Sequence, residues 1–268
     1  MTNSPTLDVW LEGIGLVGPG FDGWSHAQAL LTGAEAYTPR ATTVPAAVLL
    51  PAAERRRAGV AVRISLAIAL EAAQHAQRDA GTLATVFTAS GADGDNCHTI
   101  CEALASEERL ISPTRFHNSV HNAPAGYWTI AARCMAPSTS LCAYDASFCA
   151  GLLEATTQVR ATQAPVLLVA YDTAYPQPLR AARPIPDAFG VAFVLAPTRG
   201  ERAFARLSVT LDGQAPNGCV NPLFEALRHA IPAARSLPLL EAIARREATE
   251  RVLDYLPGLS LRVGLRPC

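Results

Sequence analysis

Residues 143–155, AYDASFCAGLLEA, form the stretch of this sequence whose residue types are best suited to chemistry. Small residues predict a turn that leads directly into a helix, where the helix dipole would lower the pKa of a nucleophile. Cys149 is the one thiol of the stretch. With His117 or His121 as its base, Cys149 could serve an acyltransferase or a thioesterase.

A structural interpretation of the same residues competes with the catalytic one. Free cysteine behaves as a small hydrophobic residue, and the sequence CAGLL, which includes Gly151, is typical of a buried helix start. In that case the sulfur of Cys149 points into the packing. Asp145 and Ser147 would then cap the helix by accepting hydrogen bonds from its first N–H groups.

A second group of residues could be drawn as a metal site. It contains Cys97, His98 and Cys101, with His117 and His121 farther along the chain. The C-x-x-x-C spacing places two thiols on one face of a helix. No second C-x-x-C pair accompanies them, and the GADGDN segment lacks the ligand pattern of a calcium loop. We therefore expect Cys97 and Cys101 to lie on a buried helix face, with no metal and no cofactor.

The overall charge restricts the classes of function that the protein can have. The 268 residues include 22 basic and 23 acidic side chains, with a net charge of −1, which excludes a strong electrostatic footprint for nucleic acid. All the basic residues are arginine, so no lysine can form a Schiff base. Half of the residues are hydrophobic and the mean hydropathy is +0.17, which suggests that another chain covers part of the surface.

Features of the whole chain predict a cytoplasmic protein. The first residues lack the basic and apolar run of a signal peptide. The longest uncharged apolar stretch, at 164–170, is too short to span a membrane. Seven irregularly spaced cysteines fit reduced thiols better than a disulfide framework.

The elements that must position the 143–155 turn follow an α/β pattern. An alternating apolar stretch at 7–20 predicts a first strand that ends in glycine and proline. Residues 58–80 carry apolar residues all round the helical wheel apart from Arg63, which predicts a helix buried on most sides.

Later β-rich runs at 164–174 and 188–197 predict further strands around a proline-rich loop. Strands and helices in this order favour a mixed β-sheet with helices. No linker or internal repeat divides the chain, so we predict a single domain over residues 1–268.

The tail, residues 236–258, predicts an amphipathic helix. One side carries apolar residues and the opposite side carries arginine and glutamate. The apolar side consists of Leu240, Ala244, Ala248, Val252 and Leu256.

Taken together, several segments resemble the N-terminal half of a β-ketoacyl synthase of the thiolase-like fold. The segments that carry the resemblance are VWLEGIGLVGPGFDGWSHAQALLTG, RRRAGVAVRISLAIALEAA, VFTASGADGDN, HNAPAGYWTIAARCMAPSTSL and DAFGVAFVLAP. The resemblance covers residues 7–212 and implies a mixed β-sheet with helices on both faces. Residues 213–268 then form a divergent, helical C-terminal extension. The second half of a full synthase, with two catalytic histidines and a lysine, is missing or reduced to this extension.

The resembled family carries T-A-C-x-S-G where its nucleophile lies. Anchoring on Gly151 puts Phe148 in the cysteine position, whereas counting without gaps from Gly126 puts Asp145 there. Neither side chain can accept an acyl chain as a thiolate does. The resemblance therefore implies a non-catalytic partner, a chain-length factor, that forms a heterodimer with an active ketosynthase.

In its short length the chain resembles the truncated ketosynthase-like proteins of aryl-polyene and xanthomonadin-type pigment clusters. In this hypothesis Phe148 is a wall beside the partner's acyl tunnel, because its ring is large and apolar. Growth of the fatty acid-like or polyketide-like chain would stop there.

In the resembled fold, the stretch FHNSVHN before N-x-x-A-G runs along the dimer interface and reaches toward the partner's active site. The resemblance therefore implies contacts with the partner from His117, Asn118, His121, Asn122, Gly126 and Tyr127. The alternative is a set of hydrogen-bonded loop residues.

The chain could instead be a scaffold that binds acyl carrier protein without a ketosynthase. Residues 55–57, Arg-Arg-Arg, could contact an acidic carrier, or they could be a solvated charge run.

Overall fold

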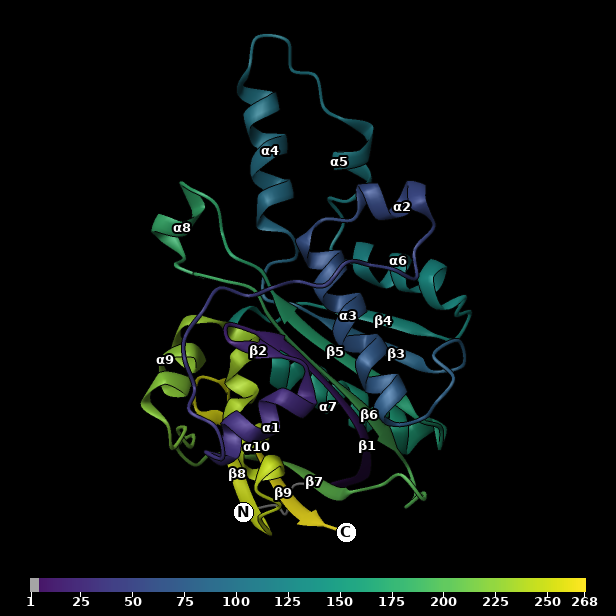
Figure 1. Cartoon of the computed structure of the whole chain (residues 1–268), viewed down its shortest axis with the longest axis vertical. Coiled ribbons are helices and arrows are strands. Elements are labelled where there is room, and N and C mark those ends of the chain that lie inside the picture. The colour runs from purple at the N-terminus through teal and green to yellow at the C-terminus, as the bar shows by residue number, and fades with distance from the viewer. Residues whose placement is uncertain (1–4) are drawn as a thin grey trace.

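In the computed structural model, which describes residues 5–268, these residues form one nine-stranded mixed sheet with helices on both faces (Figure 1). The strands are β1 (Leu7–Gly18), β2 (Phe21–Asp22), β3 (Ala84–Thr88), β4 (Ser138–Leu141), β5 (Val166–Asp172), β6 (Phe189–Ala196), β7 (Ala205–Asp212), β8 (Thr249–Leu256) and β9 (Leu259–Pro267). Their order in the sheet is β4-β3-β5-β6-β1-β7-β9-β8, and β2 pairs with the end of β1. β3 pairs in parallel with β4 and β5, and the other pairs are antiparallel. The predicted mixed sheet is confirmed.

The helices divide between the two faces of the sheet. α3 and α6 pack on one face, and α7 packs on the other face with α1 and α10 near it. The helices are α1 (Trp24–Thr32), α2 (Ala52–Arg57), α3 (Val60–His75), α4 (Gly94–Ala105), α5 (Pro113–His117), α6 (Ala123–Ala132), α7 (Ser147–Thr162), α8 (Leu179–Ala182), α9 (Pro222–Ala230) and α10 (Leu237–Ala244). Two 3-10 turns, η1 (Tyr144–Ala146) and η2 (Pro232–Ser236), precede α7 and α10.

Two glycines in β1 let the buried helix α3 lie directly on the sheet. A Cβ added at Gly13 would lie 2.1 Å from the carbonyl oxygen of Ala72, and one at Gly15 would lie 2.0 Å from that of Ile68. Any larger residue at these positions would push α3 away from the sheet, because the contacts are with backbone atoms.

The C-terminal segment is not the long helix predicted for 236–258. α10 ends at Ala244, and the following residues form the antiparallel hairpin of β8 and β9, with Gly258 at a φ of +76° in its turn. Val252 and Leu256, predicted to lie on one helix face, belong to β8 instead. The extension predicted as helical for 213–268 does contain α9 and α10, but the prediction is wrong from Thr249 onward, where the chain forms strands. β7 pairs with β9 along its whole length, and these pairs outweigh the weak helical periodicity of the segment.

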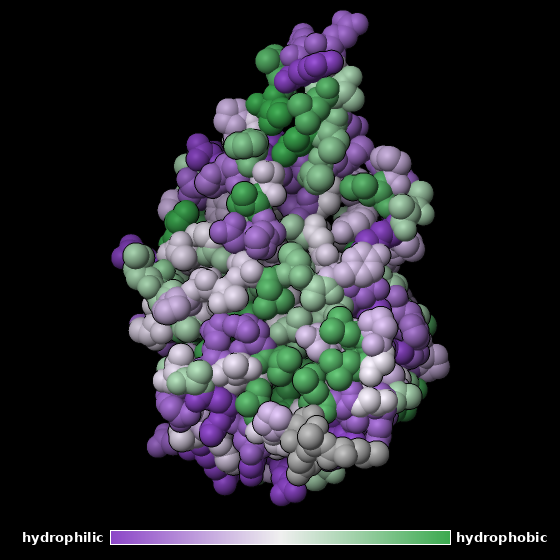
Figure 2. All heavy atoms as spheres, turned by 180° about the vertical axis from the view of Figure 1, so that it is seen from behind, coloured by the Kyte–Doolittle hydropathy of each residue, from purple (hydrophilic) through white to green (hydrophobic). Residues whose placement is uncertain are grey.

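The α4–α5 region projects from one end of the molecule (Figure 1). α4 packs mainly against α5 and stands away from the sheet. Leu104 and Leu110 are exposed there. The rear face in Figure 2 shows hydrophobic residues gathered on this projection below a hydrophilic tip. Such a surface is unusual for a helix that faces only water.

Among residues 5–268, none of the helices is both long enough and apolar enough to cross a bilayer.

Candidate functional site

The turn between β4 and α7, residues 142–146, is the predicted turn into a helix, and we call it the elbow. β4 ends at Leu141, and Tyr144 then adopts a left-handed conformation with a φ of +50°, which is uncommon for a residue other than glycine. Asp145 follows directly, within η1, and α7 begins at Ser147. A strand, a left-handed residue and a helix start thus occur in immediate succession. Asp145 occupies the first position after the left-handed residue.

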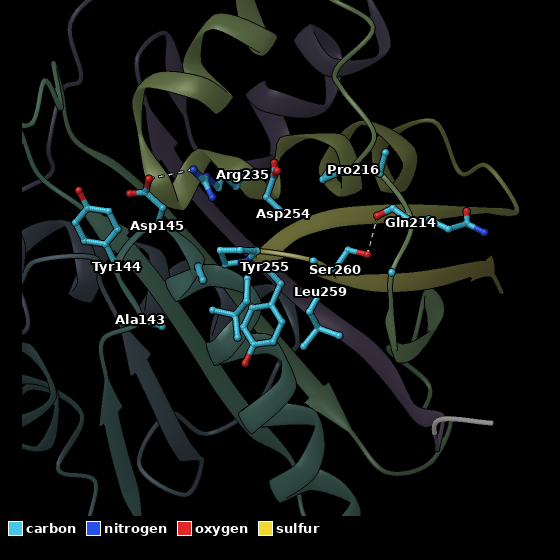
Figure 3. Close-up of a pocket in the computed structure, with 16 residues that line it drawn as sticks. Ala143, Tyr144, Asp145, Gln214, Pro216, Arg235, Asp254, Tyr255, Leu259 and Ser260 are labelled. Atoms are coloured by element: carbon cyan, nitrogen blue, oxygen red, sulfur yellow. Dashed lines mark hydrogen bonds and ion pairs between the residues drawn. The ribbon is translucent and has the colours of Figure 1, made fainter. Parts of the chain in front are cut away.

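The Asp145 carboxylate is held by two arginines. Arg183 Nη2 donates to Oδ1 at 2.6 Å. Arg235 Nη2 donates to Oδ2 at 3.1 Å, the contact drawn as a dashed line in Figure 3. The Asp145 side chain is 38% exposed and faces the pocket drawn in Figure 3. Both carboxylate oxygens therefore accept charge-assisted hydrogen bonds.

The prediction that Asp145 and Ser147 cap α7 is wrong. The N-cap of α7 is Ala146, and no side chain accepts a hydrogen bond from the first N–H groups of the helix. The oxygens of Asp145 bind arginines instead. The Ser147 hydroxyl accepts the N–H of Ala143 at 2.9 Å and lies 2.7 Å from the carbonyl oxygen of Tyr144, to which it donates. Ser147 thus tightens the turn rather than capping the helix.

Arg183 also covers the ring of Tyr144, with its guanidinium carbon 3.6 Å from the ring centroid. The arginine comes from the loop after α8, and Arg235 comes from η2. No local pattern marks either arginine in the sequence, because each reaches Asp145 only through the fold.

Phe148 faces the core. Its side chain is 1% exposed and packs edge-on against Phe193, with ring centroids 6.1 Å apart. Gly151 and Leu152 lie on the same face of α7, three and four residues later. A Cβ at Gly151 would lie 2.6 Å from Thr88 Cγ2, so this face contacts the sheet. The structure gives no support to Phe148 as a wall beside a partner's tunnel.

Cys149 is also buried, at 1% exposure, as the structural interpretation predicted. Burial raises the pKa of its thiol far above the ordinary value. A protonated thiol without solvent access is not a nucleophile. Cys142, at the start of the turn, is exposed, but burial of its thiol group also raises its pKa.

A pocket of about 680 Å³ opens beside Asp145. Its walls come from the turn around Ala146 and from the β8–β9 hairpin, whose Tyr255 and Leu259 stand side by side in Figure 3. Arg235 lies at the polar end of the pocket. The sequence prediction missed Tyr255 and Leu259, because it placed the hairpin in a helix.

The residues predicted to contact a partner lie around α5 and α6. The side chains of Asn118 and Tyr127 are buried, and Asn118 Oδ1 accepts the Tyr127 hydroxyl at 3.1 Å. Asn118 Nδ2 donates to the carbonyl oxygen of Arg57 at 2.9 Å, which ties α5 to α2. The other four residues of the set, His117, His121, Asn122 and Gly126, are exposed.

An apolar hollow of about 560 Å³ lies between α5 and α6. Phe116, Val120 and Ile130 line it, and Phe116 is 68% exposed. Met135, 93% exposed, lies just before β4. Within the described part of the chain, β4 is the outer strand on this side of the sheet, so one of its edges is unpaired. Exposed apolar side chains beside an open strand edge indicate a protein interface.

The structure does not support the alternative of a metal site. Among the described residues, no three side chains of histidine, cysteine, aspartate or glutamate gather as metal ligands would. Cys97 and Cys101 are both exposed rather than part of a buried helix face, so that part of the sequence interpretation is wrong.

Comparison with protein families gives one match. The family model described as "Beta-ketoacyl synthase, N-terminal domain" matches residues 24–248. The match therefore includes residues 213–248 of the predicted C-terminal extension. No curated protein matches the sequence.

Solved structures are similar over nearly the whole chain. A chain of the ketosynthase (ApeO) in complex with its chain length factor (ApeC) from Xenorhabdus doucetiae is 23% identical, with a TM-score of 0.74 over 96% of this chain and 99% of that chain. The ishigamide ketosynthase/chain length factor is 13% identical, with a TM-score of 0.71 over 97% and 99%. A type II PKS acyl-carrier protein in complex with its ketosynthase, AntDE:AntF, is 12% identical, with a TM-score of 0.72 over 100% of both chains. At these identities the likeness shows the fold.

Proposed function

Because the chain belongs to the family described as beta-ketoacyl synthase, N-terminal domain, and has the thiolase-like ketosynthase fold, we propose that it is a non-catalytic chain-length factor. In this role it pairs with an active β-ketoacyl synthase and helps to set the length of the acyl chain. The fold expected from the resemblance is confirmed, and the role is the proposal.

The observation that carries the proposal is the chemistry of the elbow. The position directly after the left-handed Tyr144 holds Asp145, whose carboxylate is fixed by Arg183 and Arg235. A carboxylate paired with two guanidinium groups is a poor nucleophile, because its lone pairs are already engaged. Cys149 is buried, and burial raises the pKa of its thiol and that of the exposed Cys142. The elbow thus keeps its shape, while neither Asp145 nor these thiols are activated as a nucleophile.

Asp145 rather than Phe148 is the residue that we place in the nucleophile position. Asp145 faces a pocket, whereas the Phe148 ring packs into the core. This assignment corresponds to the gap-free count from Gly126.

The side on which the partner binds is proposed from the α5–α6 hollow. Its exposed apolar side chains, together with Met135 and the open edge of β4, form the kind of surface that a second subunit covers. Phe116 is the exposed aromatic residue of the segment expected to reach the partner's active site. We therefore assign the wall function to Phe116 in place of Phe148.

The pathway proposed is that of aryl-polyene or xanthomonadin-type pigments. Its support is the resemblance of this short chain to the proteins of such pathways. An acyl carrier protein would deliver the growing chain to the complex. Arg55, Arg56 and Arg57 are exposed on α2 and could contact its acidic surface.

Coexpression with the ketosynthase of the same host tests the proposal. We expect the two chains to purify together and to yield product only as a pair. Radiolabelled acyl thioester should label the ketosynthase and leave this chain unlabelled. A covalent adduct on this chain during turnover, or failure of the two chains to associate, would contradict the proposal.

A further inference from the structure

A polar pocket of about 460 Å³ lies outside the elbow and the hollow between α5 and α6. Asp93 and Thr173 reach it from the loops that follow the parallel strands β3 and β5, and Arg63 reaches it from the first turn of α3. In Figure 1, α3 begins near the base of the projecting α4. In open α/β sheets, ligands bind at the carboxyl ends of the parallel strands. The place of this pocket in the fold is therefore one where a ligand is expected.

Arg63 is the first of three incompletely satisfied groups in this pocket. It is the only charged residue between Val60 and Leu70, on a helix that is otherwise apolar and mostly buried. The Arg63 side chain is half-buried and makes no hydrogen bond or ion pair with any residue in 5–268. A half-buried guanidinium without a partner has lost water contacts that nothing in the chain replaces.

Asp93 is the second such group. Its Oδ1 accepts the N–H of Asn96 at 3.0 Å, which caps α4. Its Oδ2 faces Gly59, where an added Cβ would lie 2.9 Å away. Burial raises the pKa of this carboxyl group. Gly59 is also one helical turn before Arg63, whose N–H donates to its carbonyl oxygen at 3.0 Å.

Asp93 and Arg63 therefore approach the same pocket and carry opposite charges, yet they form no ion pair.

Thr173 is the third incompletely satisfied group of the pocket. It is 5% exposed, and its hydroxyl oxygen has no hydrogen-bond partner among the described residues.

The remaining charged groups of the lining already have partners. Asp187 accepts the N–H groups of Thr42 and Ala188, and Asp95 pairs with Arg115 at 3.5 Å. The groups left for a ligand are therefore one cation, one carboxylate oxygen and one hydroxyl.

We propose that this pocket binds a small zwitterion of the α-amino acid class. The ligand carboxylate pairs with the Arg63 guanidinium, which presents two parallel N–H donors to such a group. The ligand ammonium donates to Asp93 Oδ2. The pocket volume of about 460 Å³ lies within the range of about 300–1,000 Å³ typical of small-molecule pockets. The site does not depend on the proposed function, because it uses neither the elbow nor the α5–α6 hollow.

The test adds the natural L-amino acids one at a time, at millimolar concentration, to the full chain. Thermal unfolding and titration calorimetry report binding. We expect at least one amino acid to raise the unfolding temperature, since a ligand that binds only the native state stabilises it. Its affinity should fall by about tenfold or more in Arg63→Met and in Asp93→Asn. Asn at position 93 keeps the oxygen that caps α4, so that variant should fold.

Arg202→Met is the matched control, because Arg202 is exposed and outside this pocket. It should bind as the unchanged chain does. The proposal is overturned if no amino acid shifts the unfolding temperature, or if Arg63→Met binds normally. It is also overturned if formate or methylamine alone gives the full effect, because a single charge would then suffice. Copurification with a ketosynthase, measured on the same variants, separates a failure of this site from a failure of the proposed function.

Discussion

Arg235 and Asp145 lie 90 positions apart in the sequence, yet their side chains meet at 3.1 Å beside the elbow. Arg183, from a third segment, completes the contact from the other side. One carboxylate thus joins η1, η2 and the loop after α8. In the proposed function, this carboxylate stands at the nucleophile position and links three segments of the chain instead of reacting.

Replacement of Asp145 by Ala should destabilise the chain modestly. Two charge-assisted hydrogen bonds disappear and two arginines lose their partner, but the carboxylate is partly exposed and screened by solvent. We expect a loss of about 1 kcal/mol in the free energy of unfolding, measured by urea denaturation. Asp95→Asn, which removes a single exposed pair with Arg115 at 3.5 Å, is the control and should change little. Equal effects of the two substitutions would contradict a joint role for Asp145.

Alkylation should distinguish the exposed thiols from Cys149. Iodoacetamide should label Cys97, Cys101, Cys142 and Cys268 in the native chain, because these residues are exposed. Cys149 should react only after denaturation, since burial both shields its thiol and raises the pKa. Peptide mass spectrometry locates the adducts. Stoichiometric labelling of Cys149 in the native chain would restore the acyltransferase hypothesis.

Two glycine substitutions should act in opposite directions. Gly151→Ala places a Cβ 2.6 Å from Thr88 Cγ2 and should cost about 1–3 kcal/mol, because α7 must move off the sheet. Gly126→Ala meets no atom within 4 Å in the middle of α6, and it should stabilise the chain by about 0.4–1 kcal/mol. Thermal and denaturant unfolding measure both effects. If Gly126 faces the partner, as we propose, the second variant should also copurify less well with the ketosynthase.

The length of the product should respond to Phe116. Phe116→Ala removes the exposed ring that we propose as the wall, so the complex should make longer chains, detected by mass spectrometry. Leu179→Ala removes an exposed apolar side chain on α8, away from the hollow, and should leave the length unchanged. If Phe116→Ala leaves the complex intact and the product length unchanged, Phe116 is not the wall.

Stability should depend on pH through Asp172. Its carboxylate is buried and accepts hydrogen bonds from the N–H and hydroxyl of Ser90, at 2.9 and 2.5 Å, and from the N–H of Ala233 at 2.8 Å. Burial raises its pKa to about 6. The folded state then binds the proton more tightly than the unfolded state, whose carboxyl has a pKa near 4.

The direction in which stability changes with pH follows from this difference in affinity for the proton. The free energy of unfolding should fall as the pH rises, and Asp172 should contribute about 1 kcal/mol less at about pH 7 than at about pH 5. Asp172→Asn should remove this part of the pH dependence. Parallel curves for Asp172→Asn and the unchanged chain would show that Asp172 does not titrate in this range.

The predictable parts of the fold were those in which local sequence and long-range packing agree. β1, α3, β5 and β6 are long apolar runs whose periodicity has one interpretation, and the structure contains all of them. The tail was mispredicted because its apolar spacing satisfies a helix weakly, whereas pairing of Leu253 and its neighbours with β9 decides the outcome. The sequence alone does not show that an edge of β7 is available to pair with that hairpin.

The site shows the same limit. The turn and the burial of Cys149 follow from small residues next to a helix, so they could be predicted locally. The roles of Asp145 and Phe148 could not be predicted in this way. A shift of three residues in the alignment moves the candidate position from a side chain that faces a pocket to one that is buried in the core. Arg183 and Arg235 carry no signal of their own, since their contact with Asp145 depends on three loops meeting.

The order of strands in the sheet has a consequence for how the protein is made. β1 is synthesised before the other strands but lies between β6 and β7, so its last neighbour is complete only at Asp212. β9 in turn separates β7 from β8, and that side of the sheet cannot close before residue 267 is synthesised. Such distant pairings make folding slow and leave apolar strands uncovered during translation. We expect nascent chains of this protein to depend on chaperones.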